Sequence, residues 1–347
     1  MKKALITGIT GQDGSYLAEL LLEKGYEVHG LTRQTALNPE RIEHLCVNES
    51  LKERFFLHRG DLCDSSSLKH VIDTIQPDEI YNLASVSHMV ESFDIPEHTA
   101  DVAAMGTLRL LEAIKIHCPT ARFYQATSSE LFGNAKEMPQ TEKTPFYPRS
   151  LYGIAKLYSF LTVVHYREAY KLFACNGILF NHESPRRREA FVSRKIILAA
   201  LRIHAGLQDK LILGNLDAKR DWGYAKDFVE GMWRMLQQEM PEDYVLATGQ
   251  TTTVRKFVEL AFLEVGMEIL WEGKGVHEKG IDRLTGKAVI QVSPEFFRPI
   301  EENVLVGDPS KAKEKLGWCP KTTLQELVQI MMKSDRERID QLVRNKS

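Results

Sequence analysis

The stretch that decides the fold is Lys3-Ala4-Leu5-Ile6-Thr7-Gly8-Ile9-Thr10-Gly11-Gln12-Asp13-Gly14. An apolar run that can form a buried strand leads into three glycines with GxxGxxG spacing, and a helical pattern over 14–24 follows. Glycines at such a junction let the backbone turn tightly and approach a pyrophosphate, while the start of the helix supplies N–H groups and a positive dipole end. The segment therefore predicts the first strand, turn and helix of a dinucleotide-binding sheet.

The same alternation of short apolar runs and longer amphipathic runs continues to Phe180. Strands are expected over 3–8, 27–33, 54–60, 79–84, 122–129 and 173–180. Helices are expected over 14–24, 65–75, 99–117 and 151–171. Repeated strand–helix–strand units of this length predict an α/β fold, a Rossmann-type doubly wound parallel sheet with helices on both faces.

The pattern changes after residue 180, where proline-containing loops such as Glu183-Ser184-Pro185 separate shorter elements and the segment 273–287 is rich in glycine and charge. We expect residues 1–180 to form the cofactor-binding domain and residues 181–347 mainly a smaller, loop-rich C-terminal α/β lobe that binds the substrate. Some segments of 215–250 are expected to return to the first domain. The charge run 333–338 is expected on a solvated helix face.

Composition narrows the class of protein. The 347 residues are 43% hydrophobic and 27% charged, as in an ordinary globular protein, and a net charge of -2 gives no general attraction to nucleic acid or an anionic membrane. The five cysteines are scattered, so neither a disulfide framework nor a cysteine metal site is expected. No stretch is long and apolar enough to span a bilayer, and the N-terminus lacks the apolar core of a signal peptide. A cytoplasmic location is expected.

The end of the second expected strand indicates which nicotinamide cofactor is bound. An NAD enzyme usually has Asp or Glu there, but no acidic residue lies between Val28 and Pro39. Arg33 is available to pair with a 2′-phosphate, which favours NADP, although it could also be a plain surface charge. Two weaker signals follow later strands: Asp61-Leu62 could flank an adenine, and the segment 82–85 could cover the nicotinamide ribose.

A candidate catalytic group follows the fifth expected strand, which ends in the run 126–130 and includes Ser128. The helix that begins near Leu151 carries Tyr152 and Lys156, and residues four apart share a helix face. A nearby ammonium lowers the pKa of a phenol and makes the phenolate a usable base near neutral pH. Hydroxyl, phenol and ammonium are therefore expected together at the carboxyl edge of the sheet, where such folds bind ligands.

With these motifs the chain resembles the extended short-chain dehydrogenases that modify nucleotide sugars, and among them most closely the GDP-mannose 4,6-dehydratase family. The resemblance covers most of the chain. The matching segments are 8–15, 122–126, Thr144-Pro145-Phe146-Tyr147-Pro148-Arg149-Ser150, Asn181-His182-Glu183-Ser184-Pro185-Arg186-Arg187, 213–223 and Phe297-Arg298-Pro299.

The resemblance implies a hydro-lyase that recycles its cofactor. Tyr152 would remove the proton of the sugar's 4-hydroxyl while hydride passes from carbon 4 to NADP. Glu130 would take the proton from carbon 5 and donate it to the departing 6-hydroxyl, after which hydride returns to carbon 6. Ser128 would hydrogen-bond the 4-oxygen, and Lys156 would also hold the nicotinamide ribose.

Together the motifs and the resemblance assign two sets of binding residues. At the cofactor they place Gly8, Thr10, Gly11, Gln12, Asp13, Gly14, Arg33, Asp61, Leu62, Leu83, Ala84, Ser85, Ser87, His98, Tyr152, Lys156, His182 and Arg187. At the GDP-sugar they place Ser87, Glu130, Asn181, Lys195, Arg220, Arg298 and Glu301. Arginine and lysine suit a diphosphate, and a carboxylate can accept hydrogen bonds from a ribose or a base.

Several positions depart from the family pattern. Here Ser128 stands for Thr, Val86 for Gln, His98 for Tyr, Arg188 for Gly, and Arg33-Gln34-Thr35 for Arg-Arg-Ser. The loss of an amide at Val86 leaves GDP-manno-heptose open as an alternative substrate to GDP-mannose. The family's Arg-Arg-Ser segment often contacts the cofactor of a neighbouring subunit, so both a homodimer and a homotetramer are open.

Two other classes of function remain alternatives. One is a GDP-sugar reductase or epimerase on the same scaffold, which would not need a carboxylate at Glu130; a reductase would consume NADPH mole for mole. The other is a non-catalytic NADP-binding regulator, against which the presence of Ser128, Tyr152 and Lys156 argues.

Overall fold

The computed structural model describes residues 1–33, 39–86, 93–296 and 304–344 of the chain. Its main feature is a seven-stranded sheet in the order β11-β6-β5-β4-β1-β2-β3, in which every neighbouring pair is parallel. The strands are β1 Lys3–Thr7, β2 Glu27–Thr32, β3 Phe55–Arg59, β4 Glu79–Asn82, β5 Arg122–Ala126, β6 Ala174–Leu179 and β11 Tyr244–Leu246. The parallel, doubly wound sheet expected from the sequence is confirmed.

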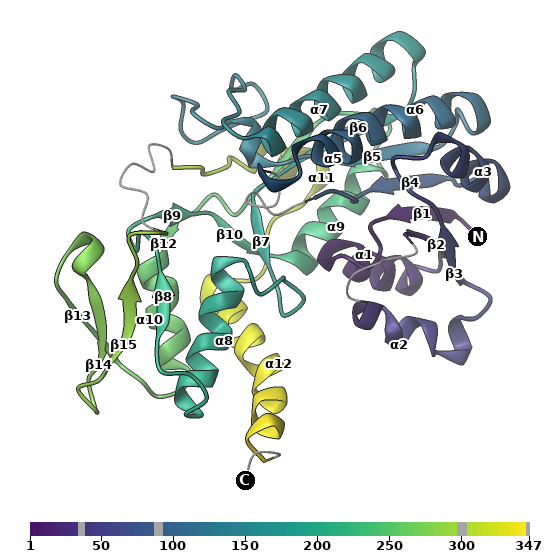
Figure 1. The fold of residues 1–347 in the computed structure, drawn as a ribbon. Coiled ribbons are helices and arrows are strands. Elements are labelled where there is room, and N and C mark those ends of the chain that lie inside the picture. The colour runs from purple at the N-terminus through teal and green to yellow at the C-terminus, as the bar shows by residue number, and fades with distance from the viewer. Residues whose placement is uncertain (34–38, 87–92, 297–303, 345–347) are drawn as a thin grey trace.

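Helices cover both faces of this sheet (Figure 1). One face carries α1 Gln12–Glu23, α9 Ala225–Met235 and α11 Ser310–Leu316. The other carries α3 Ser65–Ile75, α6 Gly106–His117 and α7 Leu151–Tyr170. Shorter pieces are α2 Glu43–Cys46, α5 Pro96–Ala100 and the single turns Pro39–Arg41, Glu49–Leu51, Ser129–Leu131 and Gly275–His277. Strands β4 and β6 are buried along their whole length, as expected for a sheet covered on both faces.

Local sequence sets the ends of the helix that carries the expected catalytic pair. Helix α7 begins after Ser150, whose side chain accepts a hydrogen bond of 3.0 Å from the N–H of Gly153. It ends at Lys171, which adopts a left-handed conformation with φ of 60°. Tyr152 and Lys156 therefore lie in the first turns of α7, next to the carboxyl end of the sheet.

Three details differ from the sequence-based expectation. Strands end one to three residues earlier than their apolar runs, because the last residues of each run turn away into loops. The helix expected over 99–117 is interrupted by a π-helical segment, Asp101–Met105, which a periodicity of 3.6 cannot reveal. Strand β11, which pairs with β6, was not expected as a strand, because three residues are too few to show a pattern; it lies in the segment 215–250, part of which was expected to return to the first domain.

The C-terminal lobe has its own sheet and helices, so the loop-rich character expected for it is only partly correct. Its mixed sheet consists of β8 Leu211–Leu213, β13 Ile269–Glu272, β14 Lys279–Asp282 and β15 Ala288–Val292. Its helices are α8 Val192–His204, α10 Val254–Leu263 and α12 Leu324–Arg344. Two short ladders pair β7 Asn181–Glu183 with β10 Trp222–Tyr224, and β9 Lys219–Arg220 with β12 Thr252–Thr253.

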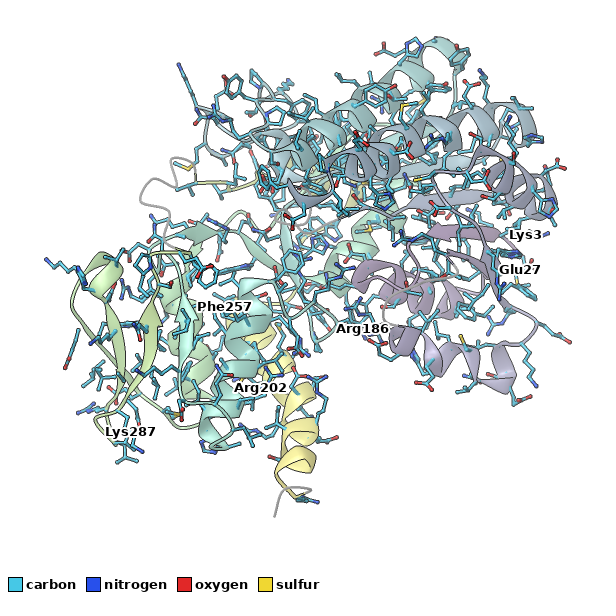
Figure 2. The ribbon with its side chains drawn as sticks, viewed as in Figure 1. Lys3, Glu27, Arg186, Arg202, Phe257 and Lys287 are labelled. Atoms are coloured by element: carbon cyan, nitrogen blue, oxygen red, sulfur yellow. The ribbon has the colours of Figure 1, made fainter. Side chains whose placement is uncertain are left out.

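Side chains tie the lobe to the large-sheet part of the molecule. Arg186, which follows β7, donates hydrogen bonds to Ser15 and Glu19 of α1 and lies over the ring of Tyr16. Figure 2 shows Arg186 where the two parts meet. Within the described residues, no helix combines the length and the apolar character that crossing a lipid bilayer requires.

Candidate functional site

A cleft of about 870 Å³ opens at the carboxyl ends of β1, β2, β4, β5 and β6, and the lobe closes its far side. Of the residues expected at the cofactor, it is lined by Gly8, Thr10, Gly11, Gln12, Asp13, Gly14, Arg33, Asp61, Leu62, Leu83, Ala84, Ser85, His98, Tyr152, Lys156, His182 and Arg187. Of the other expected residues, it is lined by Ser128, Glu130, Asn181 and Arg220. Residues that lie far apart in the sequence and were expected to form one site thus line the same cavity.

The turn that precedes and begins α1 requires glycine at two positions, Gly8 and Gly14. Gly8 has a φ of 70°, and a Cβ atom on it would lie 2.8 Å from the backbone nitrogen of Ala84. A Cβ atom on Gly14 would lie 2.3 Å from the carbonyl oxygen of Gly8. The turn therefore brings the backbone close to the cleft, as a pyrophosphate site requires.

Three observations show that the cleft fits a dinucleotide. Gly11 caps α1, and no side-chain hydrogen bond satisfies this end of the helix among the described residues. The hydroxyl oxygen of Ser85 is buried without a hydrogen-bond partner in the described part of the chain. Arg33 lines the cleft at the end of β2, together with Arg41. Backbone N–H groups for phosphates, a hydroxyl that lacks a partner and guanidinium groups are the donors such a cofactor needs.

Lys156 lines the cleft and is held in place by strand β5. Its side chain is buried, and its ammonium donates a hydrogen bond of 2.9 Å to the carbonyl oxygen of Ala126. Burial lowers the pKa of Lys156 to about 8, and Asp13 only partly offsets the effect. The ammonium lies 5.7 Å from the ring centroid of Tyr152, on the same side of α7. Lys156 is thus mostly charged near neutral pH and close to the phenol.

The pKa of Tyr152 is raised, contrary to the expectation that the Lys156 ammonium lowers it. Burial raises the pKa of Tyr152 to about 12, and the charge of Glu130 adds to this effect, while a hydrogen bond with Ser128 opposes it. The reason is geometric, because the ammonium bonds to Ala126 and not to the phenol oxygen.

Ser128 and Glu130 are placed by the turn that follows β5. The hydroxyl of Ser128 accepts a hydrogen bond of 3.2 Å from the N–H of Glu130, which starts the helical turn Ser129–Leu131. The Glu130 carboxylate lines the cleft and interacts electrostatically with the Tyr152 phenol. Hydroxyl, phenol, ammonium and carboxylate thus surround one space, which suits proton transfer to and from a bound sugar.

The structure adds residues that the sequence reasoning missed. Beneath the cleft, Thr7 donates to Asn82 at 2.6 Å, Asn82 to Gln125 at 2.7 Å, and Gln125 to the carbonyl oxygen of Ala126 at 3.0 Å. The last of these hydrogen bonds, from Gln125, goes to the same carbonyl oxygen of Ala126 that accepts from Lys156. Additional arginines also line the cleft: Arg41, Arg149, Arg186 and Arg188. A single polar residue within an apolar strand forms no recognisable sequence motif. Of the missed residues, only those in the run Arg186-Arg187-Arg188 after β7 belong to a pattern that the sequence shows.

One expected site residue lies outside the cleft, and three lie outside the described residues. Lys195 lies outside it, with its ammonium 4.9 Å from the ring centroid of Phe296, and burial lowers its pKa. Ser87, Arg298 and Glu301, like Gln34 and Thr35, lie outside the described residues. Their roles remain predictions. Val86, where a family amide is replaced, does line the cleft.

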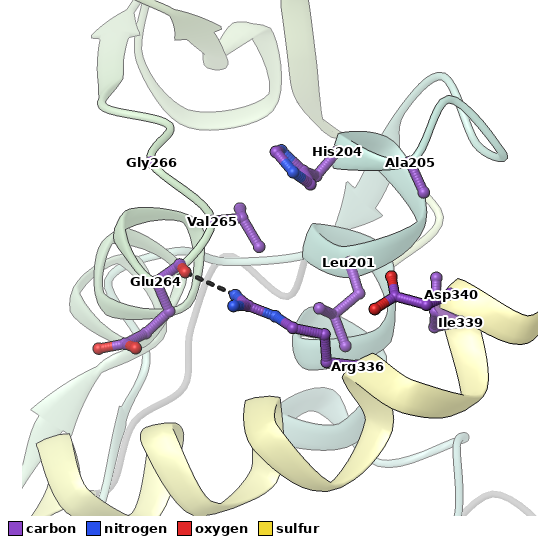
Figure 3. Close-up of a pocket in the computed structure, with 9 residues that line it drawn as sticks. All are labelled: Leu201, His204, Ala205, Glu264, Val265, Gly266, Arg336, Ile339 and Asp340. Carbon is purple, nitrogen blue, oxygen red and sulfur yellow. Dashed lines mark hydrogen bonds between the residues drawn. The ribbon is translucent and has the colours of Figure 1, made fainter. Parts of the chain in front are cut away.

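A second, smaller cavity of about 460 Å³ lies between α8, α10 and α12 (Figure 3). Leu201, Val265 and Ile339 contribute apolar surface to it, and Arg336 donates a hydrogen bond of 2.8 Å to the carbonyl oxygen of Glu264. None of the expected site residues lines this cavity. The large cleft is therefore the candidate active site.

Comparison with known proteins identifies the family. The family model described as GDP-mannose 4,6 dehydratase matches residues 5–331. The chain belongs to the GDP-mannose 4,6-dehydratase family. A GDP-mannose 4,6-dehydratase of Yersinia enterocolitica is 54% identical, with 98% of this chain and 95% of that protein covered. The human GDP-mannose 4,6 dehydratase is 55% identical, with 96% of this chain and 91% of that protein covered. These dehydratases are named for mannose, so the heptose alternative is not favoured.

Solved structures share the fold at low sequence identity. A UDP-glucose 4-epimerase of Thermotoga maritima, solved with UDP-glucose, superimposes with a TM-score of 0.81 at 22% identity, covering 97% of this chain and 99% of that chain. A dTDP-glucose 4,6-dehydratase of Bacillus anthracis, solved in complex with NAD, gives a TM-score of 0.78 at 22% identity, covering 98% of this chain and 100% of that chain. Members of the GDP-mannose 4,6-dehydratase family thus share a scaffold with enzymes of other nucleotide sugars.

Proposed function

We propose that this member of the GDP-mannose 4,6-dehydratase family converts GDP-mannose to GDP-4-keto-6-deoxymannose, with NADP as a recycled cofactor, in the cleft of the large sheet. The observation that carries the proposal is the presence of Glu130 in the same cavity as Tyr152 and Lys156. An epimerase or a reductase has no need of this carboxylate, whereas the loss of water from carbons 5 and 6 needs a group that takes and returns a proton.

The side chains divide the proton transfers between them. Tyr152, as the phenolate, accepts the proton of the sugar's 4-hydroxyl. The Lys156 ammonium, 5.7 Å from its ring centroid, attracts that phenolate, although burial raises the pKa of Tyr152 to about 12. A nicotinamide held in the cleft beside Ser85, Tyr152 and Lys156 would supply the hydride chemistry, as acceptor from carbon 4 and donor to carbon 6. Glu130 removes the proton from carbon 5, which the 4-ketone acidifies, and donates it to the departing 6-hydroxyl, so that water leaves. Hydride addition to carbon 6 leaves an enolate that takes a proton at carbon 5, and the proton that Tyr152 took from the 4-hydroxyl balances this step. Ser128 donates a hydrogen bond to the 4-oxygen.

Arginine at the end of β2 supports NADP over NAD. Arg33 lines the cleft where an acidic residue would otherwise accept hydrogen bonds from a ribose, and Arg41 lies nearby with a hydrogen bond of 3.3 Å to the carbonyl oxygen of Thr10. Neighbouring guanidinium groups, Arg188 among them, add to burial in lowering the pKa of Arg41. A cluster of positive groups beside the glycine turn suits a 2′-phosphate.

The decisive experiment replaces the carboxylate of Glu130 and keeps its size. Glu130→Gln should bind NADPH as the parent does and should lose at least about a hundredfold in the formation of the dehydrated product, because an amide can neither remove nor return a proton. Mass spectrometry of GDP-mannose reactions without added reductant measures the product directly. Glu137→Gln, an exposed residue outside the cleft, is the matched control. Dehydration at the parent rate in Glu130→Gln would refute the role of this residue.

A homo-oligomer is supported by an exposed apolar row on α7. Leu151, Ile154, Tyr158 and Leu161 are 42%, 53%, 44% and 55% exposed, although they lie on one of the largest helices of the molecule. Their spacing of three, four and three residues places them on one helix face, the pattern of helices that pack against a partner. Helix α7 lies at the outside of the molecule next to α6 (Figure 1), so a second copy can reach it. Both a dimer and a tetramer fit this arrangement.

A further inference from the structure

A buried histidine–carboxylate pair lies in the cleft at the start of α1. The Nε2 atom of His182 lies 2.9 Å from Oδ2 of Asp13, and the Nδ1 atom lies 2.7 Å from the carbonyl oxygen of Phe180. The imidazole is stacked on the ring of Phe228, with centroids 4.7 Å apart and planes at 19°. Asp13 and His182 are 169 residues apart in the chain, and both line the cleft.

When Asp13 is ionised, these contacts require a proton on both nitrogens of the ring. A carbonyl oxygen only accepts hydrogen bonds, so Nδ1 carries a proton. An ionised carboxylate also only accepts, so Nε2 carries one as well, and the ring is an imidazolium. Burial alone would raise the pKa of Asp13 and lower that of His182, but their attraction and hydrogen bond outweigh it and shift both in the opposite direction.

A second side chain holds the carboxylate in place. The amide nitrogen of Gln12 donates to Oδ1 of Asp13 at 3.0 Å and to the carbonyl oxygen of His182 at 3.1 Å, and its amide oxygen accepts from Ser184 at 2.8 Å. The remaining ionisable groups around the pair come from three elements. They are Tyr124 of β5, Tyr152 and Lys156 of α7, and Arg187 after β7, which is paired with Glu183.

The pair matters because of where the carboxylate lies. Asp13 is in the first turn of α1, the end of the helix that faces the cleft and suits an anion. An uncompensated carboxylate there would repel the diphosphate of a dinucleotide. We propose that His182 is held as an imidazolium whose task is to neutralise and orient Asp13, so that this end of α1 can receive the anionic cofactor. The inference rests on the proposed function only in naming that cofactor.

The first test observes the ring itself. In protein labelled with ¹⁵N-histidine, the His182 nitrogen signals should be those of an imidazolium at about pH 7.5, where an unperturbed histidine is mostly neutral. In Asp13→Asn the asparagine can donate to Nε2, so the ring should become neutral at the same pH. A neutral His182 in the parent protein would overturn the proposal.

The second test measures coupling through NADPH affinity, read from the fluorescence of the bound cofactor. His182→Gln should weaken binding about tenfold near neutral pH, because it leaves the Asp13 charge uncompensated. Asp13→Asn should weaken binding less than His182→Gln does, and the double variant Asp13→Asn/His182→Gln should bind as Asp13→Asn does, because the histidine then has no carboxylate to neutralise. His29→Gln is the matched control, because His29 is a buried histidine that contacts Glu27 at 2.8 Å outside the cleft.

The pH dependence separates this pair from Lys156, which titrates in the same cleft. As pH rises through the pKa of His182, parent affinity should fall, and Asp13→Asn should keep only the part of that fall due to Lys156. Equal losses from His182→Gln with and without Asp13 would overturn the inference and leave the proposed function intact. Coupling without any dehydration of GDP-mannose would instead refute the proposed function and leave this inference standing.

Discussion

Gly14→Ala compares two effects on the free energy of unfolding. One is the steric cost of a Cβ atom at the glycine turn, and the other is the stability gained because alanine favours a helix over glycine. Gly14 lies within α1, where alanine is favoured over glycine by about 1 kcal/mol. Against this, the new Cβ atom would lie 2.3 Å from the carbonyl oxygen of Gly8 and 2.7 Å from Cα of Ile9, and both contacts are with backbone. Relief requires the turn to move by about 1 Å, and overpacking of this kind costs about 1–3 kcal/mol or somewhat more.

The steric cost should win by about 1–2 kcal/mol, which lowers the melting temperature by a few degrees. The functional effect should be larger, because a displacement of about 1 Å in a positioned binding group can cost about a hundredfold. Differential scanning fluorimetry and NADPH fluorescence titration measure the two effects. Gly206→Ala is the control: Gly206 has a φ of 68° and no neighbours within 4 Å of a Cβ atom, so this variant should lose stability without losing NADPH affinity. A Gly14→Ala protein that melts higher than the parent and binds NADPH within about threefold of it would refute the steric argument.

Three further outcomes follow from other parts of the molecule. The turnover number should fall as pH rises through about 8, because Lys156 loses its charge there, and a pH–rate profile of Lys156→Met should lack this limb. Replacing both Ile154 and Leu161 with Glu should convert an oligomer to a monomer in light scattering while the monomer stays folded; an unchanged mass would exclude this face of α7 as the interface. Asp335→Ala should lower the free energy of unfolding by about 3–5 kcal/mol in urea titrations, because it leaves the buried guanidinium of Arg194 without its partner; a loss below about 1 kcal/mol would contradict this.

The ion pair of α12 shows where sequence patterns mislead. The charge run 333–338 was expected on a solvated helix face, and most of it is exposed, but Asp335 is buried against Arg194 of α8. The helical spacing places Asp335 on the buried face of Met331, Met332 and Ile339, three or four residues away. Local sequence does not reveal its partner, because Arg194 is 141 residues away.

The amino-acid sequence by itself predicted the glycine turn and the parallel sheet, because these depend on glycines at a strand–helix junction and on apolar runs of fixed length. The end of one strand and a spacing of four on a helix likewise predicted Ser128, Tyr152 and Lys156 as one group, whereas Glu130 was assigned by the family resemblance. Only the tertiary structure decided the protonation of the site. The proposed imidazolium of His182 depends on Asp13 and on the carbonyl oxygen of Phe180. The raised pKa of Tyr152 depends on burial, and the Lys156 ammonium bonds to Ala126 instead. Charge states depend on desolvation and on partners that are distant in the chain, and these exist only once the chain has folded.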